Sequence, residues 1–270
     1  MEKTNKKGKK TKGEFRRLGD DVALASTSLF SGGGIGDVGI EWGVGVPVAA
    51  ACELVPSRAE LIRRNFPETK VFEGDIWKLA PSYVDFLREK LGGLRPWLVT
   101  LSPPCQGMSS NGAGRISAAI RSGQRPREDE RNRLVLPGID VLEELRPDWF
   151  LLENVRRMEN TVIRNERNEP ENILACLARR LHPHGYTIRS SILDFRSYGV
   201  PHHRERLITI GCRLSSVAEK VPPVDDVFFR KPTDLHPVPT HGAEGLPPFL
   251  SLRDAIGHLP SLDAGDNLAD

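Results

Sequence analysis

The chain alternates short apolar runs with amphipathic stretches, and this alternation restricts the fold more than any other feature of the sequence. Six runs rich in Val, Ile, Leu or Phe are predicted strands: Ala23–Phe30, Val46–Glu53, Trp97–Ser102, Asp148–Asn154, Thr187–Phe195 and Leu207–Gly211. Apolar residues recur at helical spacing between them, in Pro56–Asn65, Pro81–Leu91, Leu134–Leu145 and Glu171–Leu181; Pro56 and Pro81 suit first helical turns. The pattern predicts an α/β fold, a doubly wound, mostly parallel, Rossmann-like sheet with helices on both faces.

Two stretches break this alternation and set the expected domain limits. Residues 108–133 are polar and contain Gly and six Arg, which indicates a long functional loop beside a site. From residue 214 onward Pro is frequent, and only Ser251–Leu259 has a helical pattern. We expect a disordered basic arm over residues 1–20, a main domain over 21–213 and a Pro-rich extension over 214–270.

The formal net charge of +2 hides an uneven distribution. Residues 1–17 hold eight Lys or Arg against two Glu, a surplus of six, so residues 18–270 carry a net charge of −4. The arm is either a solvated tail or a phosphate contact. No apolar run approaches the roughly 18 residues that span a bilayer, and the N-terminus lacks the apolar stretch of a secretory signal. A cytoplasmic protein without a membrane span is expected.

A glycine-rich turn after the first expected strand indicates a ligand site. In Phe30-Ser31-Gly32-Gly33-Gly34-Ile35-Gly36, absent side chains let the backbone approach a ligand closely. Glu53 ends the second strand about 20 residues later, where a carboxylate can accept from both hydroxyls of a ribose. Asp75 follows an expected third strand and is placed to meet an adenine amino group, or it caps the next helix. A nucleoside-containing cofactor is predicted, and NAD is so far as good a candidate as any.

One of the four cysteines stands in a setting typical of a nucleophile. The cysteines form no Cys-x-x-Cys pair, so we expect reduced thiols and no zinc site at Cys52, Cys105, Cys176 and Cys212. Cys105 follows a strand end and two prolines that fix the backbone, and a polar loop comes after it. An ordinary buried cysteine is the alternative, but these neighbours argue against a core position.

A carboxylate is expected to share the crevice of Cys105. The fifth strand ends in Glu153-Asn154-Val155, and strand ends of one parallel sheet point the same way. An acid beside a thiolate suits an electron-poor heterocycle, because it can hold or protonate a ring nitrogen while sulfur adds to the ring. The alternative is that Glu153 is a surface acid or a helix cap.

Two arginines enter the last strand. Arg204 and Arg206 are two residues apart, so they point to the same side and could bind a carbonyl oxygen or a carboxylate. The adjacent His202 and His203 point apart on an extended chain, and no further ligand cluster accompanies them. No metal site is therefore predicted.

Four motifs now form a recognisable series. Phe-Ser-Gly-Gly-Gly, Pro-Pro-Cys-Gln, Glu-Asn-Val and Arg-x-Arg, in this order over residues 24–211, resemble the signature blocks of DNA (cytosine-5)-methyltransferases. Pro239–His241 and Ser251–Pro260 also resemble the segment that follows the Arg-x-Arg block in that family. The resemblance implies a catalytic methyltransferase domain over residues 21–213. An NAD oxidoreductase explains neither Pro-Pro-Cys-Gln nor Glu-Asn-Val.

The resemblance implies a covalent mechanism on a cytosine flipped out of DNA. Cys105 would add to carbon 6, carbon 5 would take the methyl group of S-adenosylmethionine, and loss of the carbon-5 proton would release the enzyme. Glu153 would bind nitrogen 3 and the exocyclic amine. Arg206, supported by Arg204, would bind the carbonyl oxygen, and Pro104 would shape the pocket. The loop 108–133 would close over the substrate strand. No metal is implied. The implied contacts of the cofactor are Phe30, Ser31, Gly32, Gly33, Gly34, Ile35, Gly36, Glu53, Leu54, Asp75, Ile76 and Ser102.

Three departures from the family pattern matter. His202 stands where the family usually has Gln, and Ser28 stands where it has Asp before Leu-Phe; neither alters the central chemistry. The sequence also ends at Asp270, where the family continues into a target-recognition domain and a C-terminal helix. We therefore expect poor recognition of DNA sequence by this chain alone. The chain is expected to be either a fragment or one subunit of a split enzyme whose second chain supplies that domain, in a restriction–modification setting. The alternatives are a tRNA cytosine-5 methyltransferase and a silent, partner-binding subunit.

Overall fold

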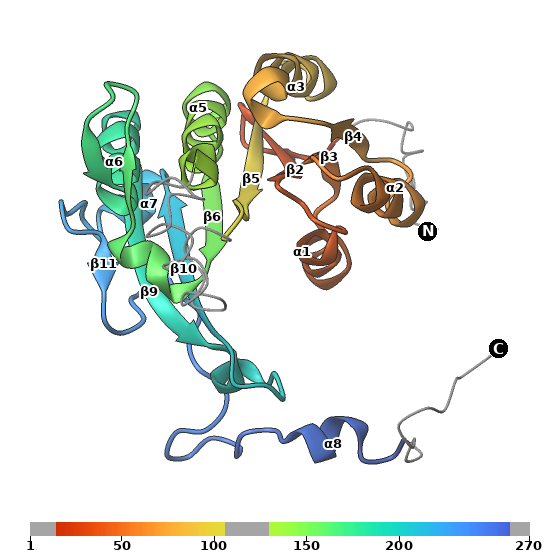
Figure 1. Cartoon of the computed structure of the whole chain (residues 1–270), viewed down its shortest axis with the longest axis vertical. Helices are drawn as coiled ribbons and strands as arrows, with labels where there is room; N and C mark the ends of the chain where they lie inside the picture. The colour runs from red at the N-terminus through yellow and green to blue at the C-terminus, as the bar shows by residue number, and fades with distance from the viewer. Residues whose placement is uncertain (1–14, 106–129, 260–270) are drawn as a thin grey trace, which may run out of the picture.

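The computed structural model describes residues 15–105 and 130–259. Its centre is a nine-stranded sheet with the order β11-β9-β10-β6-β5-β2-β3-β4, and β1 pairs with β2 outside this path (Figure 1). The strands are β1 Arg17–Leu18, β2 Val22–Leu29, β3 Val48–Glu53, β4 Lys70–Glu73, β5 Arg95–Leu101, β6 Trp149–Asn154, β9 Thr187–Asp194, β10 Glu205–Cys212 and β11 Phe228–Phe229. A separate hairpin joins β7 Val162–Arg164 and β8 Pro170–Asn172.

The helices lie between these strands. The α-helices are α1 Ile35–Val38, α2 Pro56–Asn65, α3 Ile76–Lys90, α5 Val135–Leu145, α6 Ile173–Leu181, α7 Ser215–Ala218 and α8 Leu252–Ile256. Short 3₁₀ turns are η2 Glu130–Leu134, η3 Arg156–Asn160, η4 His182–His184 and η5 Phe195–Tyr198, and η1 Gly39–Val44 is a π-helix. No helix within the described ranges is long and apolar enough to cross a bilayer.

Strand direction decides which residues meet at the edge of the sheet. β4, β3, β2, β5 and β6 are mutually parallel, whereas β10 runs antiparallel to both β6 and β9. The amino end of β10 therefore lies beside the carboxyl end of β6, with Leu207 opposite Asn154. The predicted mostly parallel, doubly wound sheet is confirmed.

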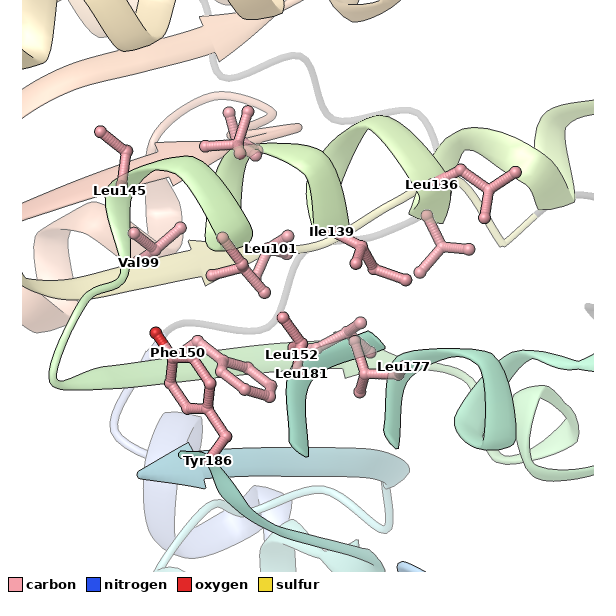
Figure 2. Close-up of a cluster of buried hydrophobic side chains, with 14 of the residues drawn as sticks. Val99, Leu101, Leu136, Ile139, Leu145, Phe150, Leu152, Leu177, Leu181 and Tyr186 are labelled. Atoms are coloured by element: carbon pink, nitrogen blue, oxygen red, sulfur yellow. The ribbon is translucent and has the colours of Figure 1, made fainter. Parts of the chain in front are cut away.

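The main core fills the space between the sheet and a row of three helices, α3, α5 and α6 (Figure 1). Helix α5 turns one continuous apolar stripe toward β5 and β6, and its residues Ile139 and Leu142 are both fully buried. Figure 2 shows this layer, in which Phe150 of β6 packs edge-to-face against Tyr186 at a centroid distance of 5.4 Å. Burial of such side chains stabilises the fold by about 1.5–3 kcal/mol each.

A smaller cluster lies around Ala51 of β3, where Ile62 and Phe66, at the end of α2 and just after it, pack against the strand. The turn between β2 and α1 touches the same aromatic ring, because a Cβ on Gly34 would lie 2.9 Å from Phe66. Gly34 also has a φ of 81°, which side-chain-bearing residues rarely adopt. The glycine-rich turn is thus shaped by packing against the end of α2.

Two helix starts differ from the expectation. Helix α3 begins at Ile76, not at Pro81, because the side chain of Asp75 accepts a hydrogen bond from the Trp77 backbone N–H at 3.1 Å and caps the first turn. Helix α6 begins after Asn172, whose side chain accepts from the Leu174 N–H at 2.8 Å. Side-chain caps therefore set both boundaries.

The expected division at residue 213 does not coincide with an edge of the sheet. β11 pairs in parallel with β9, and Val227 is 2% exposed in the main core. Residues after 213 therefore contribute a strand to the same sheet. In the extension, the predicted helix at Ser251–Leu259 is present as α8, which begins with a capping box between Ser251 and Asp254.

Candidate active site

The carboxyl ends of the parallel strands and the amino end of β10 surround a cavity of about 450 Å³. Every predicted catalytic residue lines it, and so do half of the predicted cofactor residues. The predicted residues in its wall are Phe30, Glu53, Leu54, Asp75, Ile76, Ser102, Pro104, Cys105, Glu153, Arg204 and Arg206. We call Phe30, Glu53 and Asp75 the Glu53 side of the cavity, and Cys105, Glu153 and Arg206 the Cys105 side.

Glu53 is held almost entirely by backbone groups. Its carboxylate is buried, with one oxygen 2.8 Å from the Gly32 N–H and the other 2.9 Å from the Val55 N–H. Arg58 also lies near Glu53, but its guanidinium is 3.9 Å away and largely exposed. Because a carboxylate oxygen can accept two hydrogen bonds, Glu53 keeps capacity for two ligand hydroxyls.

The glycine-rich turn supports this carboxylate instead of lining the cavity. The cavity wall includes Phe30 but not Ser31, Gly32, Gly33, Gly34, Ile35 or Gly36. Phe30 itself has a φ of 59°, a left-handed conformation that is uncommon for a residue with a side chain. Phe30 therefore reaches the cavity from a strained backbone position.

Asp75 caps helix α3, which the sequence left as an alternative role, and it also lines the cavity. One carboxylate oxygen caps α3 through the Trp77 N–H. The residue is half-buried and lines the cavity beside Gly74 and Ile76. The cap and a ligand contact are compatible, since the second oxygen is not used by the cap.

Cys105 is the only cysteine of the four that is not buried. Burial raises the pKa of Cys52 and Cys176 to about 12 and that of Cys212 to about 11, so these three remain thiols. The segment before Cys105 is anchored by Asn154, whose side-chain amide donates to the Pro103 carbonyl at 2.9 Å. Residues 108–129 of the predicted loop at 108–133 lie outside the described residues.

Glu153 and Arg206 form an ion pair across the β6–β10 ladder. The Arg206 Nε lies 2.9 Å from Glu153 Oε1, and the two side chains are 18% and 33% exposed, Arg206 being the more buried. The antiparallel register places Ile208 opposite Glu153, so Arg206 is two residues earlier on the same strand. The pair thus lines the cavity and is still accessible to a ligand.

The other polar residues of this segment lie farther out. Arg204 lines the same cavity as Arg206 and is exposed. His203 lies 3.5 Å from Asp194, and His202 is exposed. Across residues 15–105 and 130–259, no group of three or more His, Cys, Asp or Glu could hold a metal ion.

Sequence reasoning missed several wall residues. Arg58 and Val55 come from the start of α2, and Asn154 stands inside the Glu-Asn-Val motif but was given no role. Position could have indicated the first two, because a helix that follows a parallel strand begins at the ligand-binding edge of the sheet. Asn154 is 2% exposed, and its bond to Pro103 links residues 51 positions apart, which no local pattern reveals.

Taken together, the structure combines an open, Rossmann-like α/β sheet with a cavity that joins a buried carboxylate to a presented thiol. The profile of the C-5 cytosine-specific DNA methylase family matches residues 24–248, and the chain belongs to this family. That match contains every motif quoted above up to the Pro239–His241 segment.

Curated relatives are type II methyltransferases. M.AquIA of Picosynechococcus sp. is 30% identical over 251 residues, which cover 86% of this chain and 88% of that protein. M1.HphI of Haemophilus parahaemolyticus is 27% identical over 91% of this chain, and M1.HgaI of Avibacterium volantium is 29% identical over 90%. The chain spans only 55% and 58% of these two proteins.

Solved structures share the fold. A prophage-encoded protein of E. coli, described as a DNA modification methyltransferase, superposes with a TM-score of 0.59 at 23% identity, covering 89% of this chain and 56% of that one. A DNMT2 variant of Spodoptera frugiperda superposes with a TM-score of 0.51 at 23% identity, covering 80% and 57%. At these identities the likeness concerns the fold alone.

Proposed function

We propose that the chain transfers a methyl group from S-adenosylmethionine to carbon 5 of cytosine in DNA, with Cys105 as the nucleophile. One observation carries the proposal: a partly exposed thiol, the Glu153–Arg206 ion pair and a buried Glu53 that accepts from two backbone N–H groups line one cavity. A silent subunit has no need of this combination. The family match and the type II relatives favour DNA as the substrate.

The Glu53 side fits the nucleoside part of the cofactor. Glu53 offers oxygen lone pairs to two hydroxyls, Asp75 keeps one oxygen for an amine, and Phe30 supplies an aromatic surface. A cavity of about 450 Å³ falls within the usual range of ligand sites. When bound, S-adenosylmethionine supplies an electrophilic methyl group, and the residues of the chain bind and orient the nucleoside that carries it.

The Cys105 side fits the base. The Cys105 sulfur, as a thiolate, would bond to carbon 6, and the electrons of the 5,6 double bond would move to carbon 5. Carbon 5 would then take the methyl group, and S-adenosylhomocysteine would leave. Glu153 holds nitrogen 3, and Arg206 holds the carbonyl oxygen, where negative charge develops during addition. Transfer of the carbon-5 proton to a base would restore the double bond and expel the Cys105 sulfur as a thiolate. Arg204 lies beside this arrangement, and Pro104 limits where the ring can sit.

Target recognition by a second chain belongs to the same proposal. Helix α8 and the turn after it support it, because Leu252 and Ile256 of the helix and Leu259 beyond it are 63%, 48% and 56% exposed. An apolar face of this kind suits a protein partner. We place the reaction in the cytoplasm, in a restriction–modification setting such as the one that the names of the type II relatives indicate.

Transfer of labelled methyl from S-adenosylmethionine by the purified chain tests the function. Mixed-sequence DNA and tRNA serve as competing substrates, and Cys105→Ser is the control. We expect incorporation into DNA that depends on Cys105. Incorporation into tRNA alone would replace DNA by RNA as the substrate, and transfer that survives in Cys105→Ser would refute the mechanism. Cofactor binding without transfer would show that the second chain is required.

A further inference from the structure

Asp37 of α1 is a buried carboxylate behind the cavity wall. It is 3% exposed, and no salt bridge to it occurs within residues 15–105 and 130–259. Burial, with a contribution from the nearby Glu41, raises the pKa of Asp37 to about 6, although a hydrogen bond from Ser28 opposes this rise. Burying a charge without a cation is costly, so the position of Asp37 calls for a reason.

Asp37 is the end of a chain of hydroxyl groups. The Ser28 hydroxyl donates to Asp37 Oδ2 at 3.0 Å and lies 2.6 Å from the Ser31 hydroxyl. An ionised carboxylate only accepts hydrogen bonds, so the single proton of Ser28 is committed to Asp37. Towards Ser31, Ser28 can then only accept, and the Ser31 hydroxyl also lies 3.2 Å from the Ser28 carbonyl and 3.4 Å from the Cys52 carbonyl.

This series of hydrogen-bonded groups flanks Phe30, the strained residue of the cavity wall. Phe30, with its φ of 59°, lies between Ser28 and Ser31, and the bond between their hydroxyls spans it. The Ser31 N–H also donates to the Cys52 carbonyl at 3.1 Å, one residue before Glu53. Strained conformations persist where surrounding contacts enforce them.

We propose that Asp37 is a positioning residue for the cofactor, which acts through Ser28 and Ser31 to hold Phe30 and the turn that contacts Glu53. The inference rests on the proposed function, since it takes S-adenosylmethionine as the ligand of the Glu53 side. Asp37 does not itself line the cavity.

Calorimetric binding of S-adenosylhomocysteine to the full chain tests this role. Asp37→Ala and Ser28→Ala should each weaken binding by about 10-fold, because each removes a buried hydrogen bond to a charged group. The double variant should be no weaker than either single one, since both changes break the same chain. Asp37→Asn keeps an acceptor for Ser28 and should stay within about threefold of the wild type. In turnover, KM for the cofactor should rise while KM for DNA stays constant.

A structural control separates positioning from loss of stability. Tyr186→Phe removes another buried hydrogen bond, from the Tyr186 hydroxyl to the Pro147 carbonyl at 2.7 Å, away from the cavity. It should lower Tm comparably and leave cofactor affinity unchanged. If Asp37→Ala does not fold, Ser28→Ala decides.

The outcomes separate the two proposals. A wild-type chain that does not bind the cofactor overturns the proposed function. A wild-type chain that binds it, with Ser28→Ala and the folded Asp37 variants binding equally well, overturns the role of Asp37 alone. Additive losses in the double variant would also overturn that role, because the two residues would then act independently.

Discussion

Backbone groups hold the Glu53 side of the cavity, whereas side chains from distant parts of the sequence hold the Cys105 side. Glu53 accepts from two backbone N–H groups within 21 residues of it and is 5% exposed. On the other side, Glu153 is 33% exposed and meets Arg206 from a strand 53 residues later. The Glu53 side is therefore a preformed site, whereas the Glu153–Arg206 pair on the Cys105 side is accessible.

The difference corresponds to what each side would bind. A small cofactor is enclosed by a preformed site, and fixed backbone donors need no reorganisation when it binds. A base enters from a polymer, so the groups that meet it must remain reachable from outside. We therefore expect a mutation on the Cys105 side to reduce methyl transfer without loss of cofactor affinity, and a mutation on the Glu53 side to weaken cofactor binding.

The largest expected effect tests this separation directly. Cys105→Ser should reduce methyl transfer by about 10³-fold or more, because an alcohol is a far weaker nucleophile than a thiolate. Affinity for S-adenosylhomocysteine should stay within about twofold of the wild type, since the change does not touch the Glu53 side. Calorimetry beside a methyl-transfer assay measures both. A parallel loss of cofactor affinity would show that the two sides form one unit.

Glu153→Gln should reduce the rate by about 10²-fold, because the neutral amide can neither protonate ring nitrogen 3 nor compensate Arg206. Glu205→Gln is the matched control. Glu205 is next to Arg206 in sequence but pairs with Arg156 at 3.1 Å outside the cavity, and both side chains are well exposed. Its rate should stay within about twofold. Equal losses in single-turnover rate would contradict a specific role for Glu153.

On the Glu53 side, Glu53→Gln should weaken cofactor binding by about 10-fold. The amide NH₂ group would face the N–H of either Gly32 or Val55, donor against donor, in a buried position. Glu73→Gln is the control, because Glu73 is opposite Glu53 on β4 but forms an exposed pair with Arg63. Its cofactor affinity should not change. Alkylation of Cys105 at an unchanged rate in Glu53→Gln would show that the Cys105 side is intact.

The same contrast explains how far the sequence could predict the structure. The parallel strands and the ends that carry Glu53, Cys105 and Glu153 were predictable, because each strand is a short apolar run with a chemical motif at its end. The pairing of Arg206 with Glu153 was not stated, since it depends on β10 running antiparallel to β6. Asn154 and Asp37 were missed because their partners, Pro103 and Ser28, are known only once the chain has folded.

Helix starts were predicted less well than strand ends. The Pro at position 81 indicated a first helical turn, but Asp75 caps the helix well before it, and the chain tolerates Pro inside α3. The β7–β8 hairpin and β11 were also missed, because strands of two or three residues contain too few positions to show a period.

The smallest expected effect concerns the dependence of stability on pH and involves Asp37, which lies outside the cavity wall. Burial raises the pKa of Asp37 from 3.8 to about 6, so the folded chain binds a proton there more tightly than the unfolded chain. Its contribution to stability is full below pH 3.8 and is lost as the pH rises through about 6. Asp37→Asn cannot titrate and serves as the reference. From about pH 5 to about pH 7, the wild type should lose about 1 kcal/mol of unfolding free energy relative to Asp37→Asn in urea titrations. Parallel curves for the two proteins would mean that Asp37 is solvated in solution and does not titrate as a buried carboxylate.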